Sequence, residues 1–207
     1  MARLDGRVII VTGGAQGIGK AYCQGLAREG AKVVVADINE SLAEKTAEDL
    51  GAAEALPMAV DVSQEAGTER MVKATLDQFG RIDGLVNNAA MFQRPSVKRG
   101  PFEDLSVEEW DRVMGVNVRG VFLGCKAVIP AMKQQKYGKI VNISSGTVLT
   151  GTPRFAHYVT SKAAVIGLTR CIAREVGDYN ICVNAVAPGL TLSLDDVSDE
   201  GMKQYEQ

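Results

Sequence analysis

Apolar residues follow two patterns that alternate along the chain. Short runs rich in β-branched residues, of which VIIV within residues 7–12 is the first, recur at 32–36, 55–60, 82–86, 139–143 and 180–186. Runs that are apolar at every position are typical of strands buried on both faces of a parallel sheet. The pattern therefore predicts six strands, and Pro57 fits the third only at its beginning or at a sheet edge.

Longer amphipathic stretches separate these runs and predict the helices. They end near residues 28, 50 and 79, and two more cover the region of residues 107–130 and about 153–176. Asn39 and Ser63 are placed to cap two of these helices, and Ser106 with Glu109 forms a capping box. The alternation is not interrupted by a repeat or a linker, so we predict a single α/β domain over residues 1–207 with a doubly wound parallel sheet.

A glycine-rich turn joins the first strand to the first helix. Residues 12–19 read TGGAQGIG, with a strand before them and a helix after them. Glycine allows a close backbone approach, and the helix N-terminus presents free N–H groups to a pyrophosphate. The second strand ends at Asp37, 18 residues past Gly19 (37 − 19), close to the ~20 expected for a carboxylate that binds ribose hydroxyls. Such a carboxylate repels a 2′-phosphate, and neither Gln16 nor Ile38 supplies a cation, so we predict NAD rather than NADP.

Tyr158 and Lys162 lie four residues apart in a predicted helix and therefore share one face. A positive charge near a phenol favours the phenolate and lowers the tyrosine pKa toward a working range. By spacing alone, a solvated surface pair is the alternative interpretation. Ser145, at the end of the preceding strand, could either stabilise a turn or donate a hydrogen bond to a reacting oxygen. His157 is the only histidine and points about 100° away from Tyr158, so we interpret it as structural or surface.

Asn117 lies within the apolar stripe VMGVNVRGVFLGC. An asparagine inside a helix lowers helix propensity, so we expect its side chain to hydrogen-bond to a specific partner.

Composition narrows the classes of function. The chain has 23 Lys and Arg against 25 Asp and Glu, interspersed, which disfavours nucleic acid as a partner. No uninterrupted apolar run approaches the ~18 residues of a membrane span, so we expect a soluble, cytoplasmic protein. Four cysteines are scattered without a CxxC pair, and we expect them to be reduced and buried, with no metal.

Taken together, these motifs resemble those of the classical short-chain dehydrogenase/reductase family. The matching residues, in chain order, are Thr12-Gly13-x-x-x-Gly17-x-Gly19, Asp37, Asp61-Val62, Asn87-Asn88-Ala89, Asn117, Ser145, Tyr158-x-x-x-Lys162 and Pro188-Gly189. The resemblance implies a Rossmann sheet of strand order 3-2-1-4-5-6-7, a nicotinamide cofactor and assembly as a homotetramer, or else a homodimer.

The same resemblance implies roles for individual residues. Tyr158 would be the proton donor and acceptor, Ser145 would hold the substrate oxygen, and Lys162 would stabilise the phenolate and bind the nicotinamide ribose. Asn117 would anchor a water that passes the proton to solvent. The cofactor-binding set is Gly13, Gln16, Gly17, Ile18, Gly19, Asp37, Ile38, Asp61, Val62, Asn88, Ala89, Tyr158, Lys162, Pro188 and Gly189.

Three departures from the family pattern stand out. Ala90 replaces a glycine after Asn87-Asn88-Ala89, and Ser193 stands where a threonine is usual. Family members also continue into a further helix and a seventh strand, whereas this sequence stops at Gln207, so we expect it to lack its C-terminal part.

The predicted function is an NAD(H)-dependent oxidoreductase that interconverts a secondary alcohol and a ketone. Two alternatives remain open, a 3-oxoacyl-thioester reductase and a dinucleotide-binding protein without catalysis. The expected pocket edge, residues 91–94, 147–151 and 190–194, is largely apolar and suggests a neutral substrate, although Arg94 could meet a carboxylate.

Overall fold

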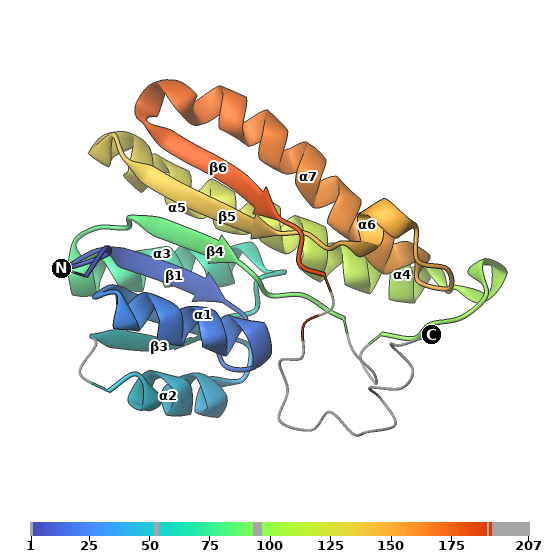
Figure 1. The fold of residues 1–207 in the computed structure, drawn as a ribbon, viewed down its shortest axis with the longest axis horizontal. Coiled ribbons are helices and arrows are strands. Elements are labelled where there is room, and N and C mark those ends of the chain that lie inside the picture. The colour runs from blue at the N-terminus through green and yellow to red at the C-terminus, as the bar shows by residue number, and fades with distance from the viewer. Residues whose placement is uncertain (1, 52–53, 93–96, 190, 192–207) are drawn as a thin grey trace.

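The computed structural model describes residues 2–51, 54–92, 97–189 and 191, and in this part of the chain six parallel strands form one sheet (Figure 1). The strands are β1 (Val8–Thr12), β2 (Lys32–Asp37), β3 (Ala55–Ala59), β4 (Gly84–Asn87), β5 (Gly138–Ile143) and β6 (Ile181–Val186). Their spatial order is β3-β2-β1-β4-β5-β6. The order reverses between β1 and β4, which is where open α/β sheets bind ligands. The predicted doubly wound fold and its first six strands are confirmed.

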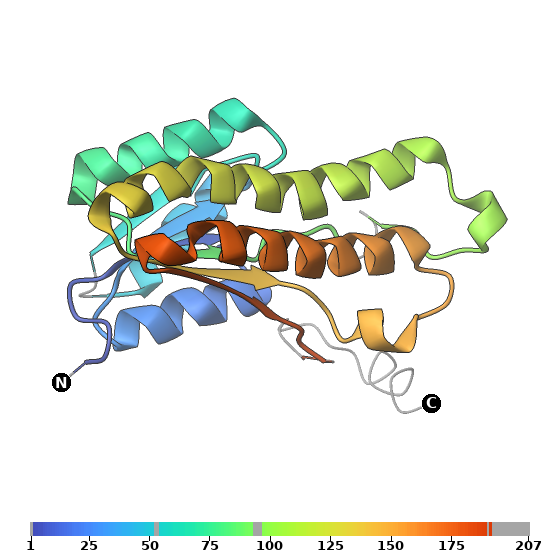
Figure 2. The same ribbon diagram turned by 90° about the horizontal axis from the view of Figure 1, so that it is seen from above.

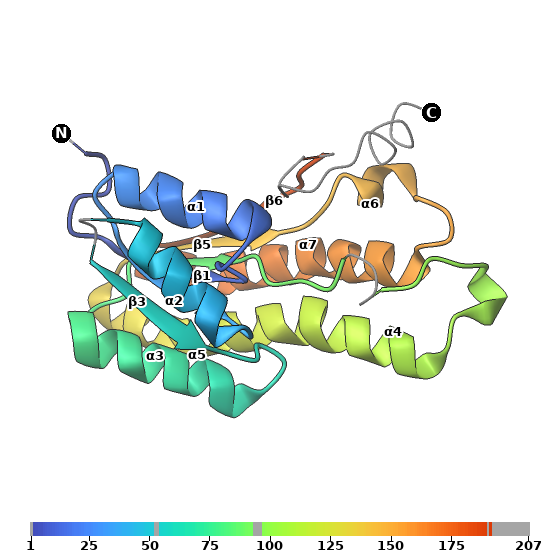
Figure 3. The ribbon, with the colours of Figure 1, turned by 90° about the horizontal axis from the view of Figure 1, so that it is seen from below.

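Helices cover the two faces of the sheet. They are α1 (Gly17–Arg28), α2 (Glu40–Asp49), α3 (Glu65–Phe79), α4 (Val107–Met114), α5 (Gly120–Gln135), α6 (Thr147–Thr150) and α7 (Ala156–Val176), with short turns η1 (Phe102–Asp104), η2 (Gly115–Arg119) and η3 (Gly177–Tyr179). Figures 2 and 3 show α1 on one side of the sheet and α3 and α5 on the other. The start of α7 and all of α4 extend past the carboxyl ends of the strands (Figure 1).

Alternate residues of β1 and β2 supply two hydrophobic cores, as a period of two requires. Ile10 of β1 belongs to a cluster with Met71, Val128 and Ile172 of α3, α5 and α7. Its neighbour Val11 faces the opposite way and packs with Cys23 and Ala43 of α1 and α2. The continuous apolar runs at β1 and β2 therefore correspond to strands that are covered on both faces.

Some predicted boundaries differ from the structure for identifiable reasons. β4 begins at Gly84 rather than Ile82, because the Ile82 N–H and C=O pair with the side-chain amide of Gln135 at 3.0 and 2.9 Å. α7 begins at Ala156 rather than near 153, since Gly151 and Arg154 have φ of 61° and 60°.

Ser63 does not cap α3, contrary to the prediction. The cap position is Gln64, which makes no side-chain cap bond, and the Ser63 hydroxyl donates to Asp61 Oδ1 at 2.7 Å. The predicted caps at Asn39 and Ser106 are confirmed, because their side chains accept from the N–H groups of Leu42 and Glu109.

α4, η2 and α5 form one continuous helical stretch. Residues Val107–Gln135 are long and apolar enough, by length and composition, to cross a membrane, with a mean hydropathy of 1.3 over the most apolar part. In the fold, however, Val121, Val128 and Met132 of this stretch are buried in the hydrophobic core. The apolar character is that of a core helix lying on the sheet.

The expectation of four buried cysteines is wrong for two of them. Cys23 and Cys125 are buried free thiols, whereas Cys171 and Cys182 are exposed. Cys182 belongs to β6, which is the edge strand in the described sheet and has one face exposed. Apolar neighbours in sequence therefore did not imply burial.

A buried carboxylate joins the beginnings of β1 and β4. Asp83 accepts hydrogen bonds from the Val8 N–H at 3.0 Å, from Arg7 at 2.8 Å and from Arg81 at 2.6 and 2.7 Å. Burial alone would raise the pKa of this carboxyl, but these hydrogen bonds outweigh it and lower the pKa below its ordinary value. The carboxylate therefore stabilises the folded state at neutral pH.

We predict that Asp83→Asn lowers the free energy of unfolding by about 2 to 4 kcal/mol at pH 7, because it removes charge-assisted bonds to a buried group. A carboxyl with a lowered pKa contributes stability that is lost as the pH falls through its folded-state value, so the difference should shrink below about pH 4. Urea denaturation at several pH values measures it.

The matched control is Asp77→Asn, which removes the same charge from an exposed pair with Lys73 on α3. Exposed pairs contribute about 0 to 1 kcal/mol. Equal losses for the two variants would contradict the anchoring role of Asp83.

Candidate active site

The glycine-rich turn lies between the ends of β1 and β4, and Asn88 holds it there. The Asn88 side chain donates to the carbonyls of Thr12 and Gly13, both at 3.0 Å. In return, the Thr12 hydroxyl accepts from the backbone N–H groups of Asn88 and Ala89 at 3.1 and 3.2 Å. The structure thus brings together two motifs that are 75 residues apart in the chain.

Two glycines of this turn have no space for a side chain. A Cβ on Gly19 would lie 1.9 Å from the Gly13 carbonyl oxygen, and one on Gly13, where φ is +63°, would lie 2.8 Å from Ala89 Cα. Only glycine permits this approach and this backbone conformation. The first turn of α1, with Gln16 as its N-cap and Gly17 and Ile18 following, thereby begins at the switch point of the sheet, where its free N–H groups could bind an anion.

Asp37 is almost fully buried at the end of β2, next to this turn. Its carboxylate accepts from the backbone N–H groups of Ala15 and Asn39, both at 3.1 Å. Each carboxylate oxygen has lone pairs beyond these two bonds. The residue therefore fixes the turn and could also accept from a ribose hydroxyl.

A hollow of about 610 Å³ lies just beyond Asp37, lined by Ile38, Asn39, Glu40, Ser41 and Glu44. It contains two carboxylates, and no lysine or arginine is in its lining. Ile38 is 75% exposed beside it, an apolar surface at the ligand-binding edge. The charge of this hollow suits a neutral ribose better than a ribose phosphate.

Asp61 and Val62 follow β3 at the same edge. Asp61 Oδ1 accepts from the N–H and the hydroxyl of Ser63, and Val62 is buried against Gly120, where an added Cβ would be 2.8 Å away. The two residues therefore lie at the carboxyl end of β3, and their contact with adenine stays a prediction.

Tyr158 lies in the first turn of α7 with 6% of its surface exposed. Burial raises the pKa of its phenol, and two groups oppose that rise, a hydrogen bond from Ser145 and the positive charge of Arg99. Ser145 Oγ accepts from the N–H and the hydroxyl of Thr147 at 3.2 and 2.9 Å, which leaves its own proton for Tyr158. Ser145 and Tyr158, 13 residues apart (158 − 145), are thus brought together as predicted.

Lys162 shares the buried face of α7 with Tyr158, so the pair is not a solvated surface pair. Its Nζ is 5.7 Å from the Tyr158 ring centroid and donates to the Ile143 carbonyl at 2.8 Å. Burial lowers the pKa of Lys162 to about 8. The expected lowering of the tyrosine pKa is not seen, because burial of the phenol dominates and the lysine ammonium bonds to the strand.

Asn117 lies in the π-helical turn η2 and is fully buried. Its side chain accepts from the Met91 N–H at 2.8 Å and donates to the Met91 carbonyl and to Ser161 Oγ at 3.2 and 3.1 Å. Ser161 in turn donates to the Tyr158 carbonyl at 2.7 Å. The expected specific partner is therefore confirmed, and it links the helix to the Tyr158 turn.

Pro188 and Gly189 lie next to the turn that follows Ser145, and their contact with the nicotinamide stays a prediction. The Gly146 N–H donates to the Pro188 carbonyl at 2.8 Å. Arg94 and Ser193 lie outside the described residues. Among the residues that the structure does describe, no group of three or more His, Cys, Asp or Glu side chains could hold a metal ion.

Three residues near Tyr158 were not identified from the sequence as part of the site. Phe155 stacks on the Tyr158 ring, Arg99 lies over Phe155, and His157 is buried with its Nε2 3.5 Å from Glu109. Phe155 precedes Tyr158 by three residues, a helical spacing that could have indicated contact. Arg99 comes from a distant loop and gave no such signal.

Comparisons with known proteins agree with this arrangement. Levodione reductase of Leifsonia aquatica is 42% identical over 211 aligned positions, which cover 99% of this chain and 76% of that protein. Cyclopentanol dehydrogenase of Comamonas testosteroni is 42% identical over 194 positions, covering 92% and 75%.

Solved structures show the same similarity. Levodione reductase superposes with a TM-score of 0.89 at 38% identity, covering 99% of this chain and 78% of that one. NAD⁺-bound xylitol dehydrogenase gives 0.86 at 36% identity, covering 90% and 71%. A 3-ketoacyl-(acyl-carrier-protein) reductase from Brucella melitensis, complexed with NADH, gives 0.85 at 36% identity, covering 90% and 76%.

The sequence profile of the family described as short chain dehydrogenase matches residues 7–199. The match includes the glycine turn, Asp37, Asn117, Ser145, Tyr158 and Lys162, which the fold gathers at one edge of the sheet. The chain belongs to the short-chain dehydrogenase family.

Proposed function

We propose that this protein is an NAD(H)-dependent oxidoreductase that interconverts a secondary alcohol and a ketone, with Tyr158 as general acid and base. The observation that carries the proposal is that Ser145 interacts with the buried phenol of Tyr158 at the carboxyl ends of the strands, where the glycine turn also lies. A proton carrier and a hydrogen-bond donor next to a dinucleotide cradle are what hydride transfer at a carbinol carbon needs. The nicotinamide, when bound, supplies the hydride chemistry.

Each side chain has a defined part in this reaction. In the oxidation direction the Tyr158 phenolate takes the hydroxyl proton of the alcohol, while the Ser145 hydroxyl donates a hydrogen bond to the same oxygen. In the reduction direction Tyr158 returns the proton to the developing alkoxide. Lys162, with its pKa lowered by burial to about 8, would replenish the proton of Tyr158, and Asn117, which holds the adjoining turn in place, would anchor a water for that path.

The glycine turn and Asp37 support NAD as the cofactor. The glycine turn is too tight for a Cβ on Gly13 or Gly19. The N-terminus of α1, which follows the turn, would bind the pyrophosphate. Asp37 would bind the adenosine ribose, and Glu40 and Glu44 line the hollow that a 2′-phosphate would have to enter. Asn88, Ala89, Pro188 and Gly189 would complete the adenosine and nicotinamide sides.

Apolar side chains near Tyr158 support a neutral, partly hydrophobic substrate. The Phe92 and Tyr158 ring centroids are 5.3 Å apart, and Leu149 of α6, four residues after Ser145, is exposed. Two relatives are named for cyclic substrates, levodione and cyclopentanol. We therefore propose a cyclic or branched secondary alcohol or its ketone.

A 3-oxoacyl-thioester reductase is the second candidate. It is favoured by the similar structure from Brucella melitensis, which was solved with NADH. A preference for NADH therefore does not separate the two candidates, and the substrate must do so.

Assembly and location remain predictions. We propose a homotetramer in the cytoplasm, and the exposed Phe122 on the outer face of α5 is compatible with contacts between chains.

The role of Tyr158 predicts the effect of its conservative substitution. Tyr158→Phe should lower kcat by roughly 10²- to 10⁴-fold because it removes the proton carrier, while NADH binding, measured by fluorescence titration, stays within about twofold. Tyr179→Phe, the same change at an exposed tyrosine of η3, is the control. Turnover equal to wild type in Tyr158→Phe would exclude the proposed mechanism, and a protein that binds NADH but shows no turnover in wild type would favour the non-catalytic alternative.

The charge near the ribose predicts cofactor preference. NADH should bind at least about tenfold more tightly than NADPH, equal to about 1.4 kcal/mol, and Asp37→Asn should narrow that ratio. Asp49→Asn, at the far end of α2 where it pairs with Lys20, should leave the ratio unchanged. Tighter binding of NADPH to wild type would show that the interpretation of Asp37 is wrong.

A small substrate panel should separate the two candidates. We expect kcat/KM for cyclopentanol oxidation or levodione reduction to exceed that for reduction of acetoacetyl-CoA by at least about tenfold, as one added pocket interaction of about 1.4 kcal/mol would produce. A spectrophotometric assay at 340 nm follows each reaction. A preference for the thioester would favour the second candidate.

A further inference from the structure

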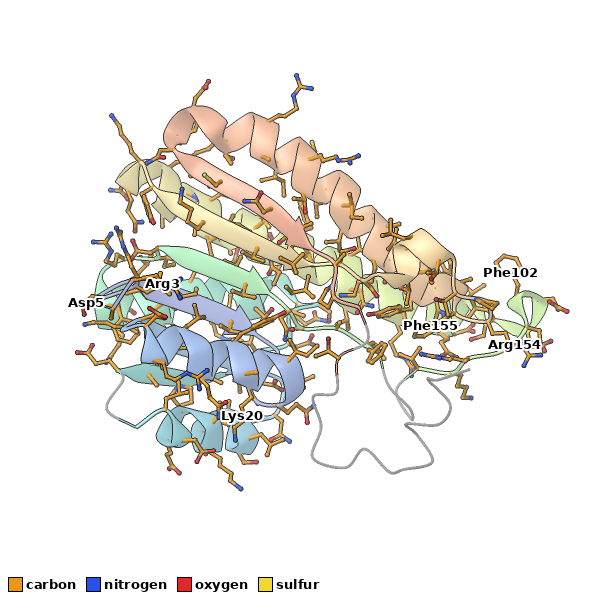
Figure 4. The ribbon with its side chains drawn as sticks, in the orientation of Figure 1. Arg3, Asp5, Lys20, Phe102, Arg154 and Phe155 are labelled. Carbon is orange, nitrogen blue, oxygen red and sulfur yellow. The ribbon has the colours of Figure 1, made fainter. Side chains whose placement is uncertain are left out.

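An aromatic stack connects an exposed arginine to the buried phenol of Tyr158. The ring centroids of Phe155 and Tyr158 are 4.5 Å apart, and the planes are inclined by 14°. The Arg99 guanidinium carbon lies 4.2 Å from the Phe155 ring centroid. Figure 4 shows Phe155 beyond the carboxyl ends of the strands, at the end of the molecule where α7 begins.

The stack is held on several sides. Phe155 is fully buried and clusters with Val97 and Val113, and its ring meets the edge of His157 at 5.7 Å. Phe92 is tilted against the Tyr158 ring at 5.3 Å. Val97, two residues before Arg99, thus ties the Arg99 loop to the same cluster, so the guanidinium lies over a fixed ring.

Among the described residues, few charged groups face Tyr158 from the elements around it. On α7, Lys162 bonds to the Ile143 carbonyl, and His157 faces Glu109 of α4. From the loop before η1, the positive charge of Arg99 acts to lower the Tyr158 pKa, against the effect of burial. A cation on an aromatic face is attracted by the ring quadrupole, so the stack itself keeps this charge near the phenol.

We propose that Arg99 is a positioning residue for Tyr158, which holds the Phe155–Tyr158 stack and supplies a positive charge that favours the phenolate. The proposal rests on the proposed role of Tyr158 as the proton carrier. It goes further by assigning electrostatic support to a loop outside the four predicted catalytic residues.

The kinetic test compares Arg99→Gln with wild type in alcohol oxidation, using cyclopentanol and NAD⁺ or the best neutral alcohol of the panel. The phenolate is the active form in this direction, so removing a charge that favours it should move the low-pH limb of kcat/KM to higher pH. We expect a shift of roughly half a pH unit, or roughly threefold in rate on that limb, as suits one solvent-screened charge. The shift should shrink at high salt.

Two matched variants separate charge from structure. Arg99→Lys keeps the charge and should restore most of the profile. Lys98→Gln removes the same charge from the neighbouring exposed residue, and it should leave the profile unchanged. A shift of equal size in Lys98→Gln, or an unshifted profile in Arg99→Gln, would overturn the proposal.

A second measurement does not depend on activity. Tyrosine labelled with ¹³C at Cζ reports the charge of each phenol by NMR, and the signal of Tyr158 is identified among the five tyrosines by its loss in Tyr158→Phe. With NAD⁺ bound, and over the pH range in which circular dichroism shows an intact fold, Tyr158 should titrate at higher pH in Arg99→Gln than in wild type. Titration at the same pH in both proteins, or in neither below pH 11, counts against Arg99. An active Tyr158→Phe would instead refute the proposed function.

Discussion

The hydrogen bonds of Asn88 to the glycine turn are the interaction on which the cofactor side of the site depends. The turn closes so tightly that Gly19 lies against the Gly13 carbonyl, and buried carbonyls must find donors. The Asn88 side chain donates to the Thr12 and Gly13 carbonyls from the next strand in the sheet. The position of the α1 N-terminus is therefore set by β4 as well as by β1.

A comparable tie fixes the catalytic side. The Ser144 hydroxyl donates to the Lys162 carbonyl at 2.8 Å, and Lys162 Nζ donates to the Ile143 carbonyl. Backbone and side chain of one residue are thus bound to the end of β5. Because Tyr158 is one turn earlier on the same helix, these bonds also determine where its phenol lies relative to Ser145 at the start of the next loop. The two halves of the site are aligned because both are attached to the carboxyl ends of neighbouring strands.

Much of this arrangement could be predicted from the sequence, because the signals are local. Continuous β-branched runs identified the strands, and glycine spacing with a carboxylate after β2 identified the nucleotide edge. Residues whose role depends on distant contacts were harder to predict. Ser63 is a residue type that often caps helices, but its hydroxyl bonds to Asp61 instead. Cys182 has apolar neighbours in sequence but lies on an edge strand. Arg99 comes near Tyr158 only through tertiary packing against Phe155. The sign of the Tyr158 pKa shift was also missed, since burial depends on the whole fold whereas the Tyr158 and Lys162 spacing does not.

The π-helical turn at Gly115–Arg119 has a consequence for how the long helix can vary. The buried positions of α4, η2 and α5 include Val113, Asn117, Val121 and Cys125, a spacing of four that would drift by about 40° per step around a regular α-helix. A wider turn absorbs part of this drift and keeps Asn117 on the inner face. Removing one residue there would turn everything on its N-terminal side by about 100° relative to α5. Insertions and deletions in this helix are thus constrained because each one rotates the buried face of the helix on one side of the change relative to the other. The length and the mostly apolar composition of the helix do not reveal this restriction.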